Sequence, residues 1–124
     1  MIDYQSVEEI RKEDIEELKK KLRSYTKEDI EFNEPHFSQQ LVLREGNRED
    51  VINRILFPDS LVYFSRDRGK YGDLIYSLHF EVSNNRTMRI PLIFDRNNKK
   101  SIYILTYIMR YRHWKHMIVK NNRR

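Results

Sequence analysis

The chain has 124 residues, enough for one compact domain, and its 24 Lys and Arg exceed its 19 Asp and Glu, which gives a formal net charge of +5. The absence of Cys excludes disulfides, thiolate nucleophiles and Cys-based zinc sites, and it fits a reducing, cytoplasmic compartment. No apolar run approaches a membrane span, and we expect no signal peptide.

The first third of the chain predicts an amphipathic, acidic helix. Ser6 and Glu9 fit a capping box, so a helix is expected to begin there. The apolar residues that follow at helical spacing are Val7, Ile10, Ile15, Leu18, Leu22 and Tyr25. Thr26 and Asp29 repeat the cap pattern, which predicts a short helical turn after this helix.

Two shorter helices are expected next. Pro35 suits the first position of a helix because the amide hydrogen it lacks has no partner there, and this helix would carry His36. Gly46 is placed to end it in a left-handed conformation. Asn47 then resembles the cap of a third helix, whose apolar stripe ends at Pro58.

Period-two alternation after these helices predicts strands. They cover residues 61–64, 74–82, 87–94 and 102–109, separated by polar turns at residues 65–70, 83–86 and 95–100. His79 falls on the polar face of its strand, where a solvent-exposed position is expected. Pro91 indicates an edge strand or a bulge, and residues 102–109, apolar on both faces, indicate a central strand.

Helices followed by strands predict an α+β domain with an antiparallel sheet of about four strands. The expected single domain, residues 1–124, has three parts. These are an acidic helical extension at residues 1–34, a core at residues 35–112 and a basic tail at residues 113–124.

Positive charge is concentrated at the C-terminal end. The net charge is −4 over residues 1–34, zero over residues 35–95 and +9 over residues 96–124. Cations interleaved with aromatic rings are typical of a surface that binds nucleic acid, because phosphates are attracted and unpaired bases can stack. Plain solubility would also explain such an end. The residues expected to bind nucleic acid are Arg96, Lys99, Lys100, Tyr111, Arg112, His113, Trp114 and Lys115.

Several residues carry a resemblance to a known family. His36 and Arg44 are eight residues apart in the second helix, and Thr106 and Arg110 follow in the last strand. With this pattern, residues 35–112 resemble the BrnT-like and RelE-like toxin ribonucleases, small endoribonucleases of toxin–antitoxin modules. The resemblance implies a RelE-like sheet, cleavage of RNA, which could be ribosome-bound, and a cognate antitoxin as partner.

Metal-independent RNA cleavage needs an acid and a base together with fixed positive charge on the phosphate. His36 would act as base or acid, Thr106 would position the phosphate, and arginines would hold it, with one phosphate lying between His36 and Arg44 on a shared helix face. The complete catalytic set is His36, Arg44, Arg89, Thr106 and Arg110.

Other roles remain open for these side chains. His36 also suits a histidine bonded locally at a helix N-terminus, and the Thr106 hydroxyl could bond to the backbone instead. Arg89 lies between apolar positions and is expected to have a partner. His113 and His116 have helical spacing for a metal, but no carboxylate accompanies them in residues 96–124, so neither a metal nor a cofactor is expected.

Two other functions are compatible with the sequence. One is a non-catalytic module that binds nucleic acid through the basic end. The other is a self-associating protein, such as a homodimer, in which the acidic first helix pairs with the basic C-terminus of another chain. The sequence has no Gly-rich phosphate loop, nucleophile elbow or His-Glu-x-x-His motif, which leaves NTPase, serine hydrolase and zincin functions without support.

Overall fold

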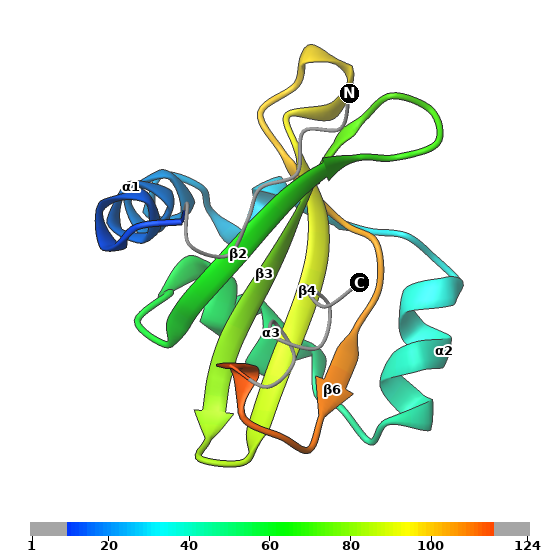
Figure 1. Ribbon diagram of the computed structural model, residues 1–124. Coiled ribbons are helices and arrows are strands. Elements are labelled where there is room, and N and C mark those ends of the chain that lie inside the picture. The colour runs from blue at the N-terminus through cyan, green and yellow to red at the C-terminus, as the bar shows by residue number, and fades with distance from the viewer. Residues whose placement is uncertain (1–9, 116–124) are drawn as a thin grey trace.

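A mixed six-stranded sheet forms the centre of the computed structural model, which describes residues 10–115 (Figure 1). The strands are β1 (Ile30–Phe32), β2 (Leu61–Arg68), β3 (Leu74–Ser83), β4 (Arg86–Phe94), β5 (Ile102–Ile104) and β6 (Ile108–Arg110). Their order is β1-β5-β4-β3-β2, and β6 pairs with β4. The β1–β5 pair is parallel, and the other pairs are antiparallel.

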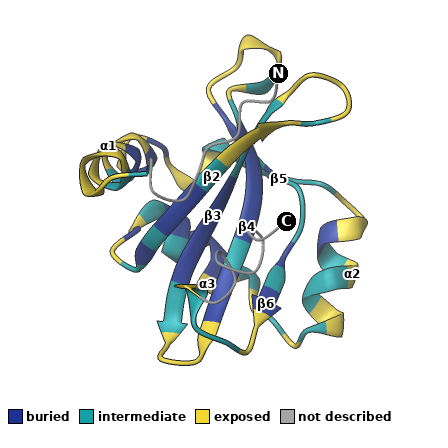
Figure 2. Cartoon of the chain, viewed as in Figure 1, coloured by how far each residue is buried: buried dark blue, intermediate teal, exposed yellow. Residues whose placement is uncertain are grey.

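The helices are α1 (Lys12–Arg23), α2 (His36–Leu43) and α3 (Arg48–Leu56), with short 3-10 turns η2 (Lys27–Asp29) and η3 (Arg96–Asn98). Figure 1 places α1 beside β2, α3 behind the sheet and α2 beside β6. Burial is greatest along the middle of β2, β3 and β4 (Figure 2). Within the described part of the chain, no helix is long and apolar enough to cross a membrane.

The expected α+β class is confirmed, whereas the expected antiparallel sheet of about four strands is wrong. Residues 30–32 add the strand β1, which pairs in parallel with β5 from Ile30 opposite Ile102. The single strand predicted at residues 102–109 is divided into β5 and β6, which pair with successive parts of β4.

Pro91 explains where this division falls. Of the two predicted alternatives, the edge strand is wrong, since β4 lies inside the sheet, with β3 on one side and β5 and β6 on the other. The bulge fits, because residues 105–107, between β5 and β6, lie opposite only two residues of β4, Ile90 and Pro91. The Pro91 carbonyl accepts a hydrogen bond from Leu105 N at 2.9 Å, between the two short strands. A proline has no amide hydrogen to donate to a partner strand, and the ladder is interrupted beside it.

The first helix begins later than predicted. Ile10 and Arg11 are not helical, and α1 begins at Lys12. The Asp14 carboxylate accepts a hydrogen bond from Arg11 N at 2.9 Å, which satisfies an amide at the helix start. The predicted cap of Ser6 and Glu9 lies outside the described residues.

The second helix ends through Glu45, and the left-handed conformation predicted for Gly46 is wrong. Glu45 has a φ of 53° and donates to the Val42 carbonyl, while Gly46 N donates to the Leu41 carbonyl at 2.7 Å. These two bonds form a Schellman motif in which Glu45 takes the left-handed position and Gly46 follows it. A Cβ atom at Gly46 would lie 2.7 Å from the Tyr107 ring, so close packing requires this glycine.

The third helix begins as predicted, because the Asn47 side chain accepts a hydrogen bond from Asp50 N at 3.1 Å. The predicted helical turn after Thr26 is also present, as η2.

The first strand of the predicted series is longer than expected. β2 runs through the residues assigned to a polar loop as far as Arg68, because they pair with β3 up to Leu74.

Candidate functional site

The structure brings His36 and Thr106 together although 70 residues separate them. His36 Nε2 lies 3.0 Å from Thr106 Oγ1, and the direction of this hydrogen bond depends on the tautomer of the ring. His36 is the first residue of α2 and is exposed. An exposed imidazole fixed on one side by a hydroxyl can take or give a proton on a bound molecule.

The N-terminus of α2 is held by Glu34. Its carboxylate accepts hydrogen bonds from Ser38 N at 3.0 Å and Ser38 Oγ at 2.8 Å. Arg48 donates to the same carboxylate at 2.9 Å, and this bond, the largest contribution, lowers the pKa of Glu34 below its usual range. The position of His36 is therefore set by a short network rather than by the helix alone.

The residues on both sides of Thr106, Leu105 and Tyr107, are anchored by contacts with other parts of the protein. The Leu105 carbonyl accepts a hydrogen bond from Asn33 Nδ2 at 3.2 Å, and the Tyr103 hydroxyl donates to Asn33 Oδ1 at 3.0 Å. The Tyr107 side chain is buried against Gly46. Because these residues are anchored, Thr106 is a fixed partner for His36.

Arg44 lies at the other end of α2. Its guanidinium donates a hydrogen bond to the Gln40 side chain, and it follows the last helical residue. Eight residues of α-helix correspond to about 12 Å along the axis. The structure thus pairs Arg44 with Gln40 and His36 with Thr106. That one phosphate lies between His36 and Arg44 on a shared helix face stays a prediction.

A second group of predicted residues lies on the face of the sheet opposite the core helices, here called the second face. His79 lies opposite both Tyr63 and Arg89 in the strand ladders, so the three side chains share this face. His79 is only 3% exposed, so its expected solvent-exposed position is wrong. Burial, followed by the nearby charge of Arg89, lowers the pKa of His79 to about 3.

Arg89 and Arg110 place two guanidinium groups on the second face. Arg89 lies opposite Ile108, and Arg110 lies opposite Thr87, which makes the two arginines diagonal neighbours. Burial lowers the pKa of Arg89, the charge of Arg110 lowers it further, and Asp67 acts in the opposite direction. Within residues 10–115, neither arginine forms a salt bridge.

Two buried nitrogen atoms on this face lack hydrogen-bond partners in the described part of the chain. They are His79 Nδ1 and Arg89 Nε. Leaving a buried polar group unpaired costs about 1–3 kcal/mol, and such groups are rare in folded proteins. Two such atoms on directly opposite residues therefore mark this part of the second face as a polar position whose bonding capacity the described residues do not use.

Residues 111–115 bring aromatic rings to the second face. Thr87 Oγ1 donates to the Arg112 carbonyl at 3.0 Å and anchors this segment. The Trp114 ring lies 6.2 Å from that of Tyr63 with an interplanar angle of 16°, and His113 stacks on Trp114 at 5.6 Å. Lys115 Nζ lies 5.8 Å from the Trp114 ring centre. Tyr111, 72% exposed, lies near Arg86 instead.

The remaining predicted nucleic-acid residues lie elsewhere, near η3. Lys99 Nζ lies 2.7 Å from Glu31, and this bond, the largest contribution, lowers the pKa of Glu31. Arg96 lies 3.6 Å from the Tyr103 ring centre and 3.9 Å from Glu31. Lys100 donates to the Ser24 carbonyl at 2.7 Å.

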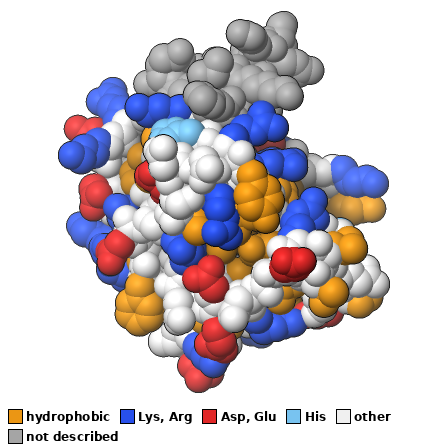
Figure 3. Space-filling view, turned by 90° about the horizontal axis from the view of Figure 1, so that it is seen from below, with side chains coloured by type: hydrophobic (Ala, Val, Ile, Leu, Met, Phe, Trp, Pro, Cys, Tyr) orange, Lys and Arg blue, Asp and Glu red, His pale blue; other side chains and the backbone are white. Residues whose placement is uncertain are grey.

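The basic residues of the segment 96–115 therefore do not form one continuous surface. Figure 1 shows the loop that contains η3 and the segment after β6 at opposite ends of the sheet. Figure 3 shows Lys and Arg interspersed with Asp and Glu on the face seen from below. The part of the predicted basic tail at residues 116–124 lies outside the described residues.

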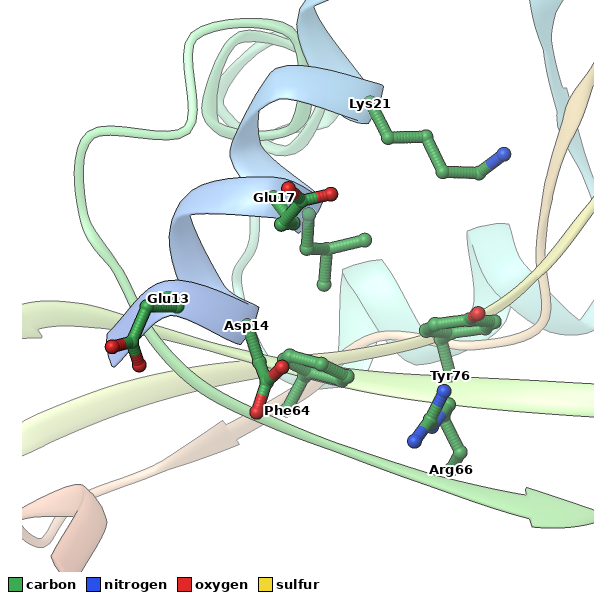
Figure 4. Close-up of a pocket in the computed structure, with 8 residues that line it drawn as sticks. Glu13, Asp14, Glu17, Lys21, Phe64, Arg66 and Tyr76 are labelled. Carbon is green, nitrogen blue, oxygen red and sulfur yellow. The ribbon is translucent and has the colours of Figure 1, made fainter. Parts of the chain in front are cut away.

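An acidic groove lies between α1 and the sheet, on the side away from the second face (Figure 4). Its volume is about 510 Å³. The charged and aromatic residues that line it are Glu13, Asp14, Glu17, Lys21, Phe64, Arg66 and Tyr76. Its three carboxylates outnumber its two cations, Lys21 and Arg66, which disfavours the binding of phosphate there.

Sequence reasoning missed Tyr63 as a member of the candidate site. Tyr63 is 6% exposed, and its ring lies 5.4 Å from that of His79 and stacks with Trp114. The available signal was its alternation with Ser65 in β2, which assigns both to the polar face. In residues 10–115, no three or more His, Cys, Asp and Glu side chains are grouped to hold a metal ion.

No protein-family model matches this chain, and searches of curated proteins and of solved structures gave no significant match.

Proposed function

We propose that the protein is a metal-independent endoribonuclease of the RelE-like toxin type. The observation that carries this proposal is the contact between His36 and Thr106, at 3.0 Å, on an exposed part of the molecule. An imidazole held by a hydroxyl at the surface is suited to proton transfer on a large substrate such as RNA.

The proposed reaction is a transfer within the RNA backbone. His36 takes the proton of a ribose 2′-hydroxyl, the 2′-oxygen attacks the adjacent phosphorus, and the bond from phosphorus to the 5′-oxygen breaks. The departing 5′-oxygen takes a proton from a water molecule, the His36 imidazolium returns its proton to the solvent, and the product ends in a 2′,3′-cyclic phosphate. Thr106 orients the imidazole and the phosphate during this step.

Fixed positive charge on the phosphate is assigned to the arginines of β4 and β6. Arg89 lies opposite Ile108, two residues after Thr106, so it is the predicted arginine nearest to Thr106 along this ladder. Arg110 adds a second guanidinium on the same face. Arg44, paired with Gln40, has a structural role in this proposal.

The resemblance over residues 35–112 supplies the remaining parts of the proposal. A cognate antitoxin would be the protein partner, RNA, free or on the ribosome, would be the substrate, and the cytoplasm would be the location.

A second candidate function is a non-catalytic module that binds nucleic acid. The observation that favours it is the stack of Trp114 on Tyr63, with Lys115 beside the indole ring. Stacked rings next to cations bind unpaired bases without any chemical step.

Incubation of the purified protein with labelled single-stranded RNA in EDTA tests these functions. The wild type is expected to leave fragments with cyclic phosphate ends, and His36→Ala is expected to lower the rate at least 100-fold. Gln39→Ala, an exposed change on the same helix, is the control and keeps full activity.

The other outcomes separate the alternatives. RNA that stays intact but shifts on a gel favours the binding module. If there is neither cleavage nor a shift, with or without added ribosomes, and the protein self-associates in a salt-sensitive manner, the self-associating function is favoured.

A further inference from the structure

The unpartnered nitrogen atoms of the second face indicate a binding position. His79 is 97% buried, and its Nδ1 has no partner among the described residues, as is also true of Arg89 Nε. The two residues lie directly opposite each other on adjacent strands. Because buried polar atoms are nearly always hydrogen-bonded, two orphaned atoms at one place suggest a group that the described chain does not supply.

The charge at this place selects an anion. Arg89 and Arg110 are diagonal neighbours on one face, and among residues 10–115 no carboxylate forms a salt bridge with either. Two guanidinium groups repel each other unless an anion lies between them. The fork of N–H donors on each arginine matches the oxygen atoms of a phosphate.

An aromatic surface adjoins the two arginines. Tyr63 lies opposite His79, and its ring is nearly parallel to that of Trp114. A purine or pyrimidine can extend this stack because every base has a flat π-face. A phosphate position next to a stacking position matches the two ends of one nucleotide.

We propose that the second face holds one nucleotide unit, with its phosphate between Arg89 and Arg110 and its base against the indole ring of Trp114, at the outer end of the stack whose inner ring, Tyr63, is only 6% exposed. The buried ring of His79, which lies between Tyr63 and Arg89 in the strand ladders, forms the floor between the base and the phosphate. This inference rests on the proposed function only in naming RNA as the natural source of the nucleotide. A free nucleotide offers the same phosphate and base.

The test measures binding by the full-length protein to a fluorescein-labelled single-stranded hexanucleotide made entirely of 2′-deoxyribonucleotides. This probe cannot be cleaved through a 2′-hydroxyl, so binding is measured separately from catalysis. Arg89→Gln and Arg110→Gln are each expected to weaken binding about tenfold or more. Trp114→Ala is expected to weaken it by about fivefold to 100-fold.

Arg66→Gln is the matched control. Arg66 belongs to the same sheet and is exposed, but it lines the acidic groove on the opposite side. Its loss lowers the net charge as much as the other changes do, and it is expected to leave binding within about twofold of the wild type. Arg110→Gln alters an exposed side chain, so its effect does not depend on whether the half-buried Arg89 tolerates substitution.

Equal binding by the wild type and Arg110→Gln, or an equal loss in Arg66→Gln, overturns the proposal. If uridine monophosphate displaces the hexanucleotide from the wild type but not from Arg110→Gln, the proposal is supported and the natural ligand can be a free nucleotide. Arg110-dependent binding of the hexanucleotide alone supports it with a nucleic-acid chain as the source.

Cleavage of the matching ribonucleotide probe is read in parallel. If binding depends on Arg110 but no RNA is cleaved, the nucleotide site is supported and the ribonuclease function is contradicted. If RNA is cleaved but the arginine variants bind as the wild type does, the ribonuclease function is supported and the nucleotide site is contradicted.

Discussion

His79 lies directly opposite Arg89 in the ladder between β3 and β4, and the histidine is the more deeply buried of the two. Burial favours the neutral imidazole, and the guanidinium beside it adds repulsion against a second positive charge. His79 therefore contributes no charge at neutral pH, and the cationic character of the second face comes from its arginines.

The low pKa of His79 makes stability depend on pH. Its value is about 3 in the folded protein against 6.5 ordinarily, so between these pH values the unfolded chain binds a proton that the folded chain does not. Stability from this group falls by about 1.4 kcal/mol per pH unit as the pH decreases below about 6.5. Denaturant unfolding of wild type and His79→Gln at pH 7 and pH 5 measures this difference.

His79→Gln is expected to show the shallower dependence of the two. Gln39→Ala, which changes an exposed side chain that does not titrate, is the control and keeps the wild-type dependence. Parallel curves for wild type and His79→Gln would show that His79 titrates normally and is not buried as described.

The end of α2 predicts opposite effects for two adjacent substitutions. Gly46→Ala places a Cβ atom 2.7 Å from the Tyr107 ring and is expected to destabilise the protein by about 1–3 kcal/mol. Glu45 adopts a left-handed backbone conformation, with a φ of 53°, that a side chain disfavours. Glu45→Gly removes this strain and is expected to stabilise the protein by up to about 1 kcal/mol. Thermal unfolding of both variants tests the assignment, and stabilisation by Gly46→Ala would contradict it.

The hydrogen bond from the Tyr25 hydroxyl to Asp95, at 2.7 Å, predicts a loss that depends on pH. Tyr25→Phe is expected to cost about 1–2 kcal/mol at pH 7. Burial acts to raise the pKa of Asp95, but the Tyr25 bond and other donors lower it by more, so the folded value lies below the unfolded one. The stabilisation is therefore complete above the unfolded pKa and is lost as the pH falls through the folded pKa.

Urea unfolding at pH 7 and at pH 2 measures this change. The difference between wild type and Tyr25→Phe should shrink at the lower pH. Tyr111→Phe removes the hydroxyl of a residue that is 72% exposed and should change stability by less than about 0.5 kcal/mol at either pH. A constant difference for Tyr25→Phe would show that the Asp95 charge is not involved.

Two substitutions at Thr106 test its role beside His36. Thr106→Ser keeps the hydroxyl and is expected to retain RNA cleavage within a few-fold, whereas Thr106→Val keeps the shape and is expected to lose about tenfold or more. Cleavage rates in EDTA at saturating RNA give the comparison. Equal rates for Thr106→Val and wild type would remove Thr106 from the proposed centre.

The elements predicted correctly are those specified by neighbouring residues. The Asn47 cap and the apolar stripe after it depend on contacts within one or two turns, and α3 forms where they indicate. The hairpin between β3 and β4 likewise turns at residues 83–86, where polar residues interrupt two alternating runs. All the residues that specify such an element lie close together in the sequence, so its pattern can be recognised from a short segment.

Distant partners explain most of the errors. The strand β1 has three residues and exists because β5 lies beside it, which no pattern near Ile30 can show. The strand predicted at residues 102–109 is divided because Pro91 of another strand interrupts its ladder. The burial of His79 depends on Tyr63 and on the arrangement of the sheet, although its alternation placed it on the correct face.

The sequence offers His36 and Thr106 as candidate site residues but does not indicate that they touch. The eight-residue spacing of His36 and Arg44 predicts only a shared helix face. The structure instead joins the start of one helix to a segment near the other end of the chain. Spacing along one element cannot reveal a contact between two elements.

The parallel pairing of β1 with β5 has a consequence for the order of folding. Ile30 meets Ile102 in this pair, and Asn33 N donates to the Ile104 carbonyl at 2.9 Å. The segment leading into α2 is thereby joined to residues that the ribosome synthesises about 70 residues later, and closing so long a loop is slow. His36 can reach Thr106 only after β5 has been made and paired with β1, so the candidate centre cannot assemble from the first helices alone.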